Sequence, residues 1–426
     1  MKWFLFLFLS IFPLHAKQLD FTTRAEGVIL MNAKTGAILF EKNAHHRAFP
    51  ASTTKIASAI YVLDQHSQEL DRTCRATKES IAFITSEAKQ QSNYRSPPYW
   101  LETGGIHIGI KNGEEFRLYD LLCGMLISSA NDASNVIAEE IGGTIPIFMG
   151  RVNEYLKKIG CLNTSFNNPH GLHHPDHFTT PYDLAIMTKK GLENPIFTKI
   201  VSTVRYNSPQ TNLECERTFT QTNKLLQKGP FFYPKAIGVK TGTTQAAGKN
   251  LIAAAQENGR CLIAVLLGLR ETRNELYQDT IRLFETAFNE TKMRRYLLKE
   301  GLTDLTKSVR GTKRLLKTAM QKDLYYDFYP SEETSVKAKV KWEISSLPIK
   351  AGEKVGRVFL IDNAGNTLQE EDLIAAESLK PNIFYWLFYL ISNHLIRVLL
   401  IVGISCLVIL TVIWRKKNTR PKSNFF

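Results

Sequence analysis

Seventeen consecutive residues without a charge, Val398–Trp414, constrain this chain more than any other feature. A helix of that length is at the short limit for crossing the hydrocarbon core of a bilayer. The aromatic stretch FYWLFY precedes it and the basic stretch RKKNTRPK follows it, and both are typical flanks of a membrane span. We therefore expect a membrane anchor over 383–414, with the span at about 398–414, and a basic cytoplasmic tail over 415–426. A buried core helix is the less favoured alternative.

The first residues predict the same orientation. The sequence MKWFLFLFLSIFPLHAKQ has Lys2 near its start, then an apolar run, and Ala16 as a small residue after which cleavage can occur. This is the layout of a secretory signal peptide, although Leu14 departs from the small residue preferred there. We expect a signal peptide over 1–16, and residues 17 to about 380 on the periplasmic or extracytoplasmic side of the cytoplasmic membrane.

The charge balance bears on the partners of the exported part. The whole chain has a formal net charge of +14, and removing Lys2 and the five basic residues of the tail leaves +8. A basic body suits a membrane surface or a polymer rich in carboxylates. The basic residues are not interleaved with aromatic ones as in segments that bind nucleic acid, so no nucleic-acid partner is expected.

Strand-like segments lie on both sides of a helical stretch. GVILMNAKTGAILFEKN predicts a hairpin, and a mainly helical stretch follows from about 116 to 198. Then AIGVKTGTTQ, NLIAAAQENG and CLIAVLLGLR predict successive strands, and NELYQDTIRLFETAFNE predicts a closing helix. We expect an α+β domain over 17–295, with an antiparallel sheet built from both ends and a helical subdomain. SVKAKVKWEI and KVGRVFLIDNAGNTL predict a small β domain over 300–380.

The stretch FPASTTKIASA places Ser52 three residues before Lys55 at the start of an apolar helix. Residues three apart on a helix lie on the same face, so Lys55 can take the hydroxyl proton of Ser52 and make it a nucleophile. That role needs a neutral amine, and burial or a neighbouring cation such as Lys240 can lower the pKa of a lysine accordingly. The same spacing occurs at Ser86 and Lys89, where polar neighbours predict an ordinary solvated pair.

Two further stretches strengthen the hypothesis of a catalytic serine. SSANDAS supplies Ser129 and Asn131 in a polar turn after the apolar LLCGMLIS, and GVKTGTTQ supplies Lys240, Thr241 and Gly242 on a strand that leads into small residues. SFN and AKTG imitate these two motifs elsewhere in the chain. Only the first set of motifs has the expected contexts. Ser52 and Lys55 lie at a helix start, Ser129 and Asn131 in a polar turn, and Lys240 to Gly242 on a strand, in that order.

With these motifs the chain resembles the penicillin-binding and serine β-lactamase superfamily, and in particular the low-molecular-mass D-alanyl-D-alanine carboxypeptidases. The likeness covers roughly 25–290 and continues more weakly through the small β domain. It includes NPHGLHHPDHFTTPYDLA, TNKLL and Arg270 after the strand CLIAVLLGL. The resemblance implies a β-lactamase/transpeptidase-like fold, hydrolysis of peptidoglycan stem peptides that end in D-Ala-D-Ala, acylation by β-lactams, and no cofactor. A membrane-spanning anchor departs from the amphipathic helix common in that family.

The resemblance also implies roles for the motif residues. The backbone N–H groups of Ser52 and Thr243 would form the oxyanion hole, Ser129 would pass a proton to the leaving amine, and Asn131 would hold the peptide. Arg270 would read the terminal carboxylate with Lys240 and Thr241, because its strand is expected beside the GVKTG strand. The expected catalytic residues are Ser52, Lys55 and Ser129, and the expected substrate-binding residues are Asn131, Lys240, Thr241, Gly242, Thr243 and Arg270.

Several alternatives use overlapping residues. A D,D-endopeptidase that cleaves cross-linked stems needs the same constellation, and a penicillin-binding sensor would be acylated without turnover. A secreted serine β-lactamase shares the chemistry, but the ExxLN stretch of its class A members does not occur between Asn131 and Lys240. A zinc peptidase is a further alternative, because His170, His173, His174, Asp176 and His177 have metal-ligand spacing. The family that the chain resembles has a corresponding loop of its own, so no metal is expected.

Overall fold

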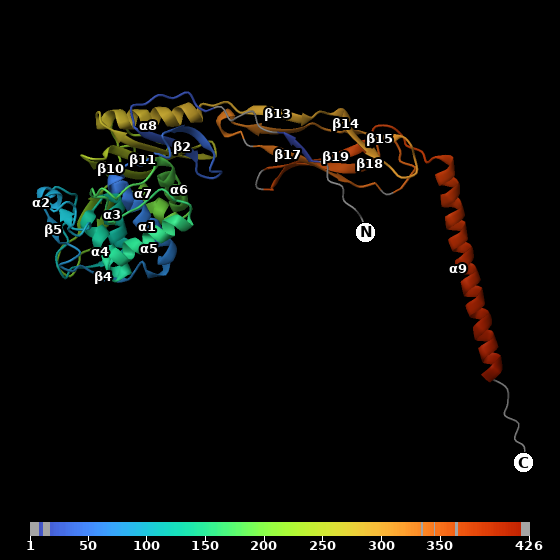
Figure 1. The fold of residues 1–426 in the computed structure, drawn as a ribbon, viewed down its shortest axis with the longest axis horizontal. Helices are drawn as coiled ribbons and strands as arrows, with labels where there is room; N and C mark the ends of the chain where they lie inside the picture. Colours follow the sequence, from blue (N-terminus) through green and yellow to red (C-terminus); the bar gives the residue numbers. More distant parts are fainter. Residues whose placement is uncertain (1–7, 12–17, 334, 345, 363–364, 419–426) are drawn as a thin grey trace, which may run out of the picture. The chain divides into compact units, whose positions relative to one another are not determined.

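The computed structural model describes residues 8–11, 18–333, 335–344, 346–362 and 365–418. It divides into two compact units, which Figure 1 shows with their elements labelled. The larger unit comprises His15–Lys292 together with Tyr329–Glu333, and the smaller unit comprises Met293–Phe328 and Thr334–Phe426 with the N-terminal residues. Each unit has its own hydrophobic core.

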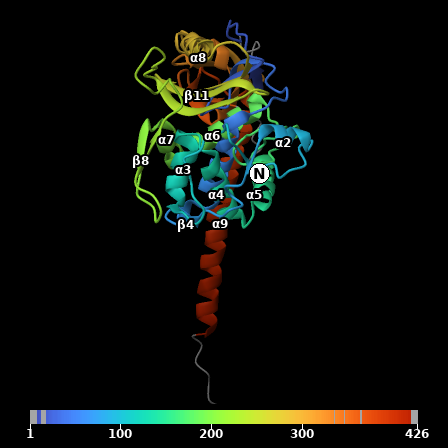
Figure 2. The ribbon, with the colours of Figure 1, turned by 90° about the vertical axis from the view of Figure 1, so that its left-hand side faces the viewer.

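The larger unit is built on a five-stranded antiparallel sheet with the strand order β10–β11–β12–β2–β3. Its strands are β2 (Gly27–Asn32), β3 (Ile38–Lys42), β10 (Ala236–Thr244), β11 (Gly248–Glu257) and β12 (Arg260–Leu269). Helix α8 (Arg273–Phe288) covers one face, and the helical part of the unit covers the other (Figures 1 and 2). Because both faces are covered, β2, β11 and β12 are nearly unbroken apolar runs.

This topology confirms the predicted α+β class, in which both ends of the domain build one sheet. Strands β2 and β3 come from the N-terminal side and β10 to β12 from the C-terminal side. One detail of the prediction is wrong, because the strand CLIAVLLGL (β12) does not lie beside the GVKTG strand (β10). Two successive hairpins place β11 between them, so that Ile252 pairs with Lys240 on one side and with Val265 on the other.

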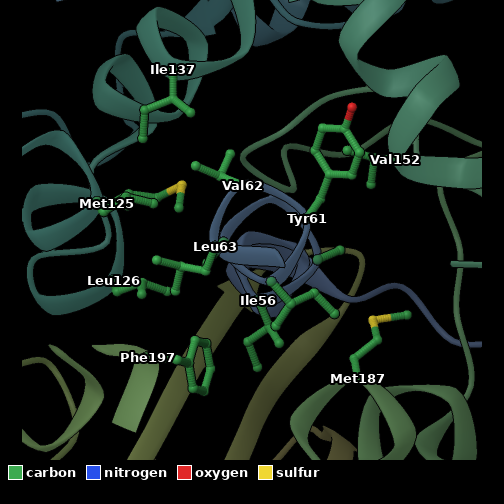
Figure 3. Close-up of a cluster of buried hydrophobic side chains, with 14 of the residues drawn as sticks. Ile56, Tyr61, Val62, Leu63, Met125, Leu126, Ile137, Val152, Met187 and Phe197 are labelled. Carbon is green, nitrogen blue, oxygen red and sulfur yellow. The ribbon is translucent and has the colours of Figure 1, made fainter. Parts of the chain in front are cut away.

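Helix α1 lies at the centre of the helical part. The helices of this part are α1 (Lys55–Gln65), α2 (Ser86–Gln91), α3 (Leu118–Ile127), α4 (Asn131–Gly142), α5 (Ile145–Lys158), α6 (Pro181–Leu192) and α7 (Pro195–Ser202), with the short 3-10 helices η1 (Ala51–Thr54) and η2 (Ser67–Glu69). Figure 3 shows Ile56, Val62 and Leu63 of α1 among side chains of the surrounding helices, such as Met125 and Phe197. Residues 55–63 are all buried, which holds the start of α1 rigidly against its neighbours.

Short strand pairs connect these helices at the surface. They are β4 (Thr73–Arg75) with β7 (Glu115–Arg117), β5 (Phe83–Ile84) with β6 (Leu101–Glu102), and β8 (Arg205–Ser208) with β9 (Arg217–Thr220). The segment after β6 is tied to the start of α4, because the Asp132 carboxylate accepts hydrogen bonds from the backbone N–H groups of Ile108, Gly109 and Ile110 at 3.0–3.1 Å.

The smaller unit contains a six-stranded sheet with the order β1–β17–β18–β19–β15–β14 and the pair β13–β16. The strands are β1 (Phe8–Ile11), β13 (Met293–Leu298), β14 (Gly301–Ser308), β15 (Leu315–Met320), β16 (Leu324–Phe328), β17 (Val336–Trp342), β18 (Lys354–Ile361) and β19 (Thr367–Ala375), and the 3-10 helix η3 (Pro330–Glu332) belongs to the larger unit. Buried and accessible side chains alternate along β17, as expected when one face covers a core. This sheet confirms the predicted small β domain.

The two ends of the chain differ in how far they are described. Helix α9 (Ile383–Asn418) includes Arg397–Arg415, a segment of 19 residues with a mean hydropathy of 2.5 and no buried part, which is long and apolar enough to cross a membrane. The predicted tail lies outside the described residues beyond 418. Most of the predicted signal peptide also lies outside them, and its residues Phe8–Ile11 form β1, antiparallel to β17.

Candidate active site

The predicted nucleophile lies in a tight turn that runs directly into α1. Ser52 belongs to η1, and the preceding Ala51 has a φ of 51°. This left-handed conformation costs free energy for a residue with a side chain, so the surroundings must stabilise it. The buried Thr54 does so, because its Oγ1 donates a hydrogen bond to the backbone oxygen of Ala51 at 2.9 Å. The turn therefore fixes Ser52 at the start of a buried helix.

Lys55 is completely buried beside Ser52. Its Nζ lies 3.0 Å from Ser52 Oγ, 2.7 Å from Asn131 Oδ1 and 2.7 Å from the backbone oxygen of His170. A neutral amine has two N–H groups and one lone pair. Because Asn131 Oδ1 and the His170 oxygen only accept hydrogen bonds, they take the two N–H groups. The lone pair is left for the hydroxyl proton of Ser52, which is the geometry that a base needs.

Burial lowers the pKa of Lys55 well below its ordinary value, because water no longer stabilises the ammonium form. The nearby charge of Lys240 lowers this pKa further, whereas Asp132 raises it. Lys240 is itself fully buried, and burial lowers its pKa to about 7. Both conditions expected for an activated lysine, burial and a neighbouring cation, are thus present.

Ser129 and Asn131 lie at the turn between α3 and α4. Ser129 is buried and has a φ of 66°, a second strained backbone position at the site. The backbone N–H of Asn131 donates to the oxygen of Ile106 at 2.8 Å, while its side chain accepts from Lys55. Asn131 therefore connects the catalytic lysine to the segment that follows β6.

Strand β10 approaches the nucleophile closely because residue 242 is a glycine. A Cβ atom at Gly242 would lie 2.9 Å from the backbone oxygen of Pro50 and 3.1 Å from the backbone nitrogen of Ser52. Both neighbours are backbone atoms that cannot turn away, so a side chain would push the strand back. The close approach places the backbone of β10 at Gly242 directly beside the nucleophile turn.

The predicted residues surround one cavity of about 570 Å³, within the range of small-molecule sites. Ser52, Ser129, Asn131, Thr241, Gly242 and Thr243 line it, together with Thr222 of the TNKLL stretch and Arg273. Thr241 Oγ1 and Thr222 Oγ1 are 2.9 Å apart. The side chain of Lys240 is not part of this wall, and its Nζ donates to the backbone oxygen of Thr241 at 3.1 Å.

The expectation that Arg270 faces this site is wrong. Its guanidinium lies 3.2 Å from Glu26 Oε1 and donates to two backbone oxygens at 3.0 and 3.1 Å, and it lines a separate cavity of about 330 Å³. The reason is the strand order, since β12 ends two strands away from β10. Arg273, in the first turn of α8, lines the Ser52 cavity instead and donates to Thr243 Oγ1 at 3.0 Å.

The segment NPHGL supports Lys55 through the backbone oxygen of His170. His170 Nε2 lies 3.0 Å from the backbone oxygen of Tyr99, and its Nδ1 accepts from a backbone N–H at 3.1 Å, so the buried ring is neutral. Burial lowers the pKa of His170 well below its ordinary value. A Cβ atom at Gly171 would lie 1.9 Å from the backbone oxygen of Ala51. This contact holds the segment, and hence the oxygen that orients Lys55, against the nucleophile turn.

Two other histidines of this segment, His174 and His177, form hydrogen bonds within the fold, whereas the buried His173 Nδ1 has no hydrogen-bond partner. His177 Nε2 lies 2.9 Å from Thr54 Oγ1, its Nδ1 accepts from the backbone N–H of Asn167 at 3.0 Å, and burial lowers its pKa to about 3. His174 Nδ1 lies 2.9 Å from Asn167 Nδ2. Among the described residues, no group of three or more His, Cys, Asp or Glu side chains is arranged to hold a metal ion. Three residues of the predicted metal-ligand spacing, His170, His174 and His177, thus take part in hydrogen bonds within the fold.

Asn250 is a supporting residue that the sequence interpretation missed. Its Nδ2 donates to the backbone oxygens of Phe49 and Pro50 at 2.9 and 3.0 Å, and its Oδ1 accepts from the backbone N–H of Gly268 at 2.9 Å. It thereby ties the chain before Ser52 to the sheet. The available signal was an asparagine inside an otherwise apolar strand, since a buried amide needs hydrogen-bond partners.

The second Ser-x-x-Lys pair also lies at this cavity. Ser86 and Lys89 line the cavity wall, and Lys89 is buried rather than solvated. The expectation of an ordinary solvated pair is therefore wrong for Lys89. Its burial follows from the contact of α2 with Glu102 of β6, a pairing of segments that the local sequence does not reveal.

The comparisons with known proteins agree with this arrangement. Residues 14–271 match the family described as D-alanyl-D-alanine carboxypeptidase, and residues 296–381 match the C-terminal domain of penicillin-binding protein 5. The chain belongs to the D-alanyl-D-alanine carboxypeptidase family. This confirms the family and the class of enzyme, a serine-type carboxypeptidase, that the three motifs predict.

Individual relatives match between 63% and 85% of the chain. D-alanyl-D-alanine carboxypeptidase DacF of Bacillus subtilis is 28% identical over 358 residues, which are 84% of this chain and 86% of that protein. The structure of penicillin-binding protein 6B from Escherichia coli aligns with a TM-score of 0.59 at 23% identity, over 85% of this chain and 98% of that one, and supports the fold alone. The Streptomyces K15 DD-transpeptidase aligns with a TM-score of 0.54 at 27% identity, over 63% of this chain and 98% of that one.

Proposed function

We propose that this chain is an exported, membrane-anchored serine carboxypeptidase that removes the terminal D-alanine from peptidoglycan stem peptides. The observation that carries the proposal is the contact of the buried Lys55 Nζ with Ser52, Asn131 and the His170 oxygen. This contact supplies an activated nucleophile at the floor of a cavity that a peptide can enter. Family membership supplies the substrate class, a peptide ending in D-Ala-D-Ala.

In the acylation half of the reaction, Ser52 Oγ attacks the carbonyl carbon of the penultimate D-alanine while its proton passes to Lys55 Nζ. The N–H groups of Ser52 and Thr243 would stabilise the resulting oxyanion, and one such donor contributes about 3–4 kcal/mol. The bond to the terminal D-alanine nitrogen then breaks, and Ser129 would relay a proton to that nitrogen. The shortened stem remains as an ester on Ser52.

In the deacylation half, a water molecule attacks the same carbonyl carbon and gives a proton to the base. The ester bond breaks, Ser52 Oγ regains its proton, and the stem leaves with a free carboxylate. A β-lactam presents its ring amide to the same nucleophile. Its leaving nitrogen stays covalently attached after ring opening, so the acyl-enzyme persists and β-lactams inhibit the enzyme.

Arg273 and Thr241 would recognise the C-terminal carboxylate of the substrate. Both line the cavity on the β10 side, and the planar guanidinium of arginine matches a carboxylate with two parallel hydrogen bonds. Lys240, which precedes Thr241 on β10, would add positive charge near the bound carboxylate. A cross-link to the ε-amine of a lysine offers no carboxylate at this position, so a carboxylate requirement favours a carboxypeptidase over an endopeptidase that cleaves such cross-links.

The ends of the chain would place the enzyme where its substrate is. Helix α9 is long enough to span a membrane, and basic residues after a span favour the cytoplasmic side. With a cleaved signal peptide over 1–16, the larger unit and the small β domain would then lie on the outer side of the cytoplasmic membrane. Peptidoglycan stems occupy that compartment, and a secreted β-lactamase would not need the anchor.

The first test is the site of acylation. After incubation with a penicillin, mass spectrometry should place the adduct on the peptide that contains Ser52, and release of D-alanine from a D-Ala-D-Ala peptide should show turnover. An adduct on Ser86 or Ser129 would contradict the assignment. Acylation without release of D-alanine would make a penicillin-binding sensor the better description.

A further inference from the structure

The cavity that contains Ser52 extends to a second group of charged side chains. Ser86, Lys89 and Glu102 line it from α2 and β6, and the hydrolysis of the D-Ala-D-Ala bond gives them no task. Lys89 Nζ lies 2.9 Å from Glu102 Oε1, and Ser86 Oγ donates to Glu102 Oε2 at 3.0 Å. The site therefore presents one positive and one negative group side by side.

Burial makes this pair unusual for a surface loop. The side chain of Lys89 is 3% exposed and that of Glu102 is 18% exposed. Removing two charges from water costs free energy that their attraction offsets only in part, so a buried ion pair is weak evidence for a purely stabilising role. At the wall of a substrate cavity, the same desolvation strengthens the interaction of each charge with a ligand.

The turn that carries Glu102 is held against the catalytic centre. The backbone N–H of Gly105 donates to the oxygen of Glu102 at 2.8 Å, and a Cβ atom at Gly105 would lie 2.7 Å from Asn131 Nδ2. Asn131 in turn contacts Lys55. The charged pair is thus connected to the catalytic centre through Gly105, Asn131 and Lys55.

The orientation of the bound peptide determines which of its residues lies next to Lys89 and Glu102. Thr241 and Arg273 are assigned to the terminal carboxylate, so the acyl part of the peptide must leave Ser52 toward the other walls of the cavity. Asn131, Glu102, Gly104 and Gly105 line the cavity together with Ser52 and are available to the acyl part. The residue immediately before D-Ala-D-Ala in a stem peptide is a diamino acid, whose side chain is the first charged group beyond the scissile bond.

We propose that Lys89 and Glu102 form a subsite for this side chain. The subsite prefers a side chain whose terminal carbon carries both an ammonium and a carboxylate group, as in diaminopimelate. The proposal rests on the carboxypeptidase function. The substrate ammonium group binds the Glu102 carboxylate, and the substrate carboxylate binds the Lys89 ammonium group and the Ser86 hydroxyl. A lysine side chain brings an ammonium group alone and leaves Lys89 without a partner from the substrate.

The test compares three peptides that differ only in the residue before D-Ala-D-Ala, which is meso-diaminopimelate, L-lysine or norleucine. The full-length protein in detergent should cleave the diaminopimelate peptide with a kcat/KM on the order of tenfold or more above that of the norleucine peptide. Lys89→Met and Glu102→Gln should each bring this ratio close to one, and Lys89→Arg should retain most of it. Lys78→Met, at an exposed lysine of the same part of the chain, should keep the wild-type ratio.

The ratio separates recognition from damage to the fold. A loop that merely loses its shape lowers the rates on all peptides together and leaves their ratio unchanged, and that result overturns the proposal. A wild-type ratio near one overturns it as well. If wild type releases no D-alanine from any of the three peptides although a penicillin acylates Ser52, the carboxypeptidase function itself fails, and the subsite proposal fails with it.

Discussion

Lys55 is the single residue on which the chemistry depends most, because it must be neutral to accept the proton of Ser52. Lys55→Arg should abolish covalent labelling by a fluorescent penicillin, since a guanidinium group stays protonated at any working pH. Circular dichroism should show that the variant is folded. The matched control is Lys34→Arg in the imitation motif AKTG, where the side chain is exposed. Equal loss of labelling in both variants would mean that the motif assignment is wrong.

The pKa of Lys55 also sets a pH dependence. Burial lowers this pKa well below 10.5, so the neutral amine predominates over a pH range in which an ordinary lysine is still charged. The labelling rate should therefore rise as the pH increases through the lowered pKa and level off above it. The measurement is the second-order acylation rate as a function of pH. A rate that rises only near pH 10.5 would show that Lys55 is not the base or is not buried.

Two arginines three residues apart should differ in effect. Arg273→Ala should lower kcat/KM on a peptide with a free C-terminal carboxylate by roughly tenfold to a hundredfold, because a charge-assisted contact is lost. Arg270→Ala should change it little, since Arg270 pairs with Glu26 in a separate cavity. The informative comparison is the same peptide with a free and with an amidated C-terminus. If wild type cleaves both equally well, carboxylate recognition does not govern the choice of substrate and an endopeptidase becomes the better description.

At the scale of elements, local spacing predicted most of the site and strand order decided the rest. The contact between Ser52 and Lys55 follows from the geometry of one helix turn, and a glycine after Lys240 and Thr241 is readable as a place of close approach. The position of Arg270 depended on which strands are neighbours, which the sequence of β12 does not contain. The burial of Lys89 likewise depends on a long-range contact with Glu102.

The approach of strand β10 to the nucleophile turn should be sensitive to a single methyl group. In Gly242→Ala, the new Cβ would lie 2.9 Å from the Pro50 oxygen and 3.1 Å from the Ser52 nitrogen, so the strand must move away from the turn. Because the oxyanion hole needs both backbones, the acylation rate should fall by roughly 10²–10³. Gly150→Ala, where a Cβ would meet no atom within 4 Å, should acylate like wild type. An unchanged rate in Gly242→Ala would exclude an oxyanion hole at this place.

At the scale of the whole molecule, the periodicity of apolar residues predicted the α+β domain and the small β domain better than it predicted the structure of the two chain ends. Alternation of buried and accessible side chains in β17, and unbroken apolar runs in β11 and β12, reflect whether one or both faces of a sheet are covered. Such patterns are local and therefore readable. The residues of the cavity all belong to the larger unit, so the reaction should not need the membrane-spanning part.

Removing residues 383–426 should therefore release a soluble protein that a penicillin still acylates at the wild-type rate. A shorter truncation that removes 398–426 keeps the aromatic stretch FYWLFY, whose Phe384 and Phe388 are 80% and 69% exposed. Aromatic side chains of this kind favour the interface between lipid and water. The measurement is the distribution of each variant between membrane and soluble fractions after a high-salt and a carbonate wash. If only the variant that lacks 383–426 is released, the aromatic stretch is a second anchor. If both variants stay on membranes, α9 is not what holds the enzyme there.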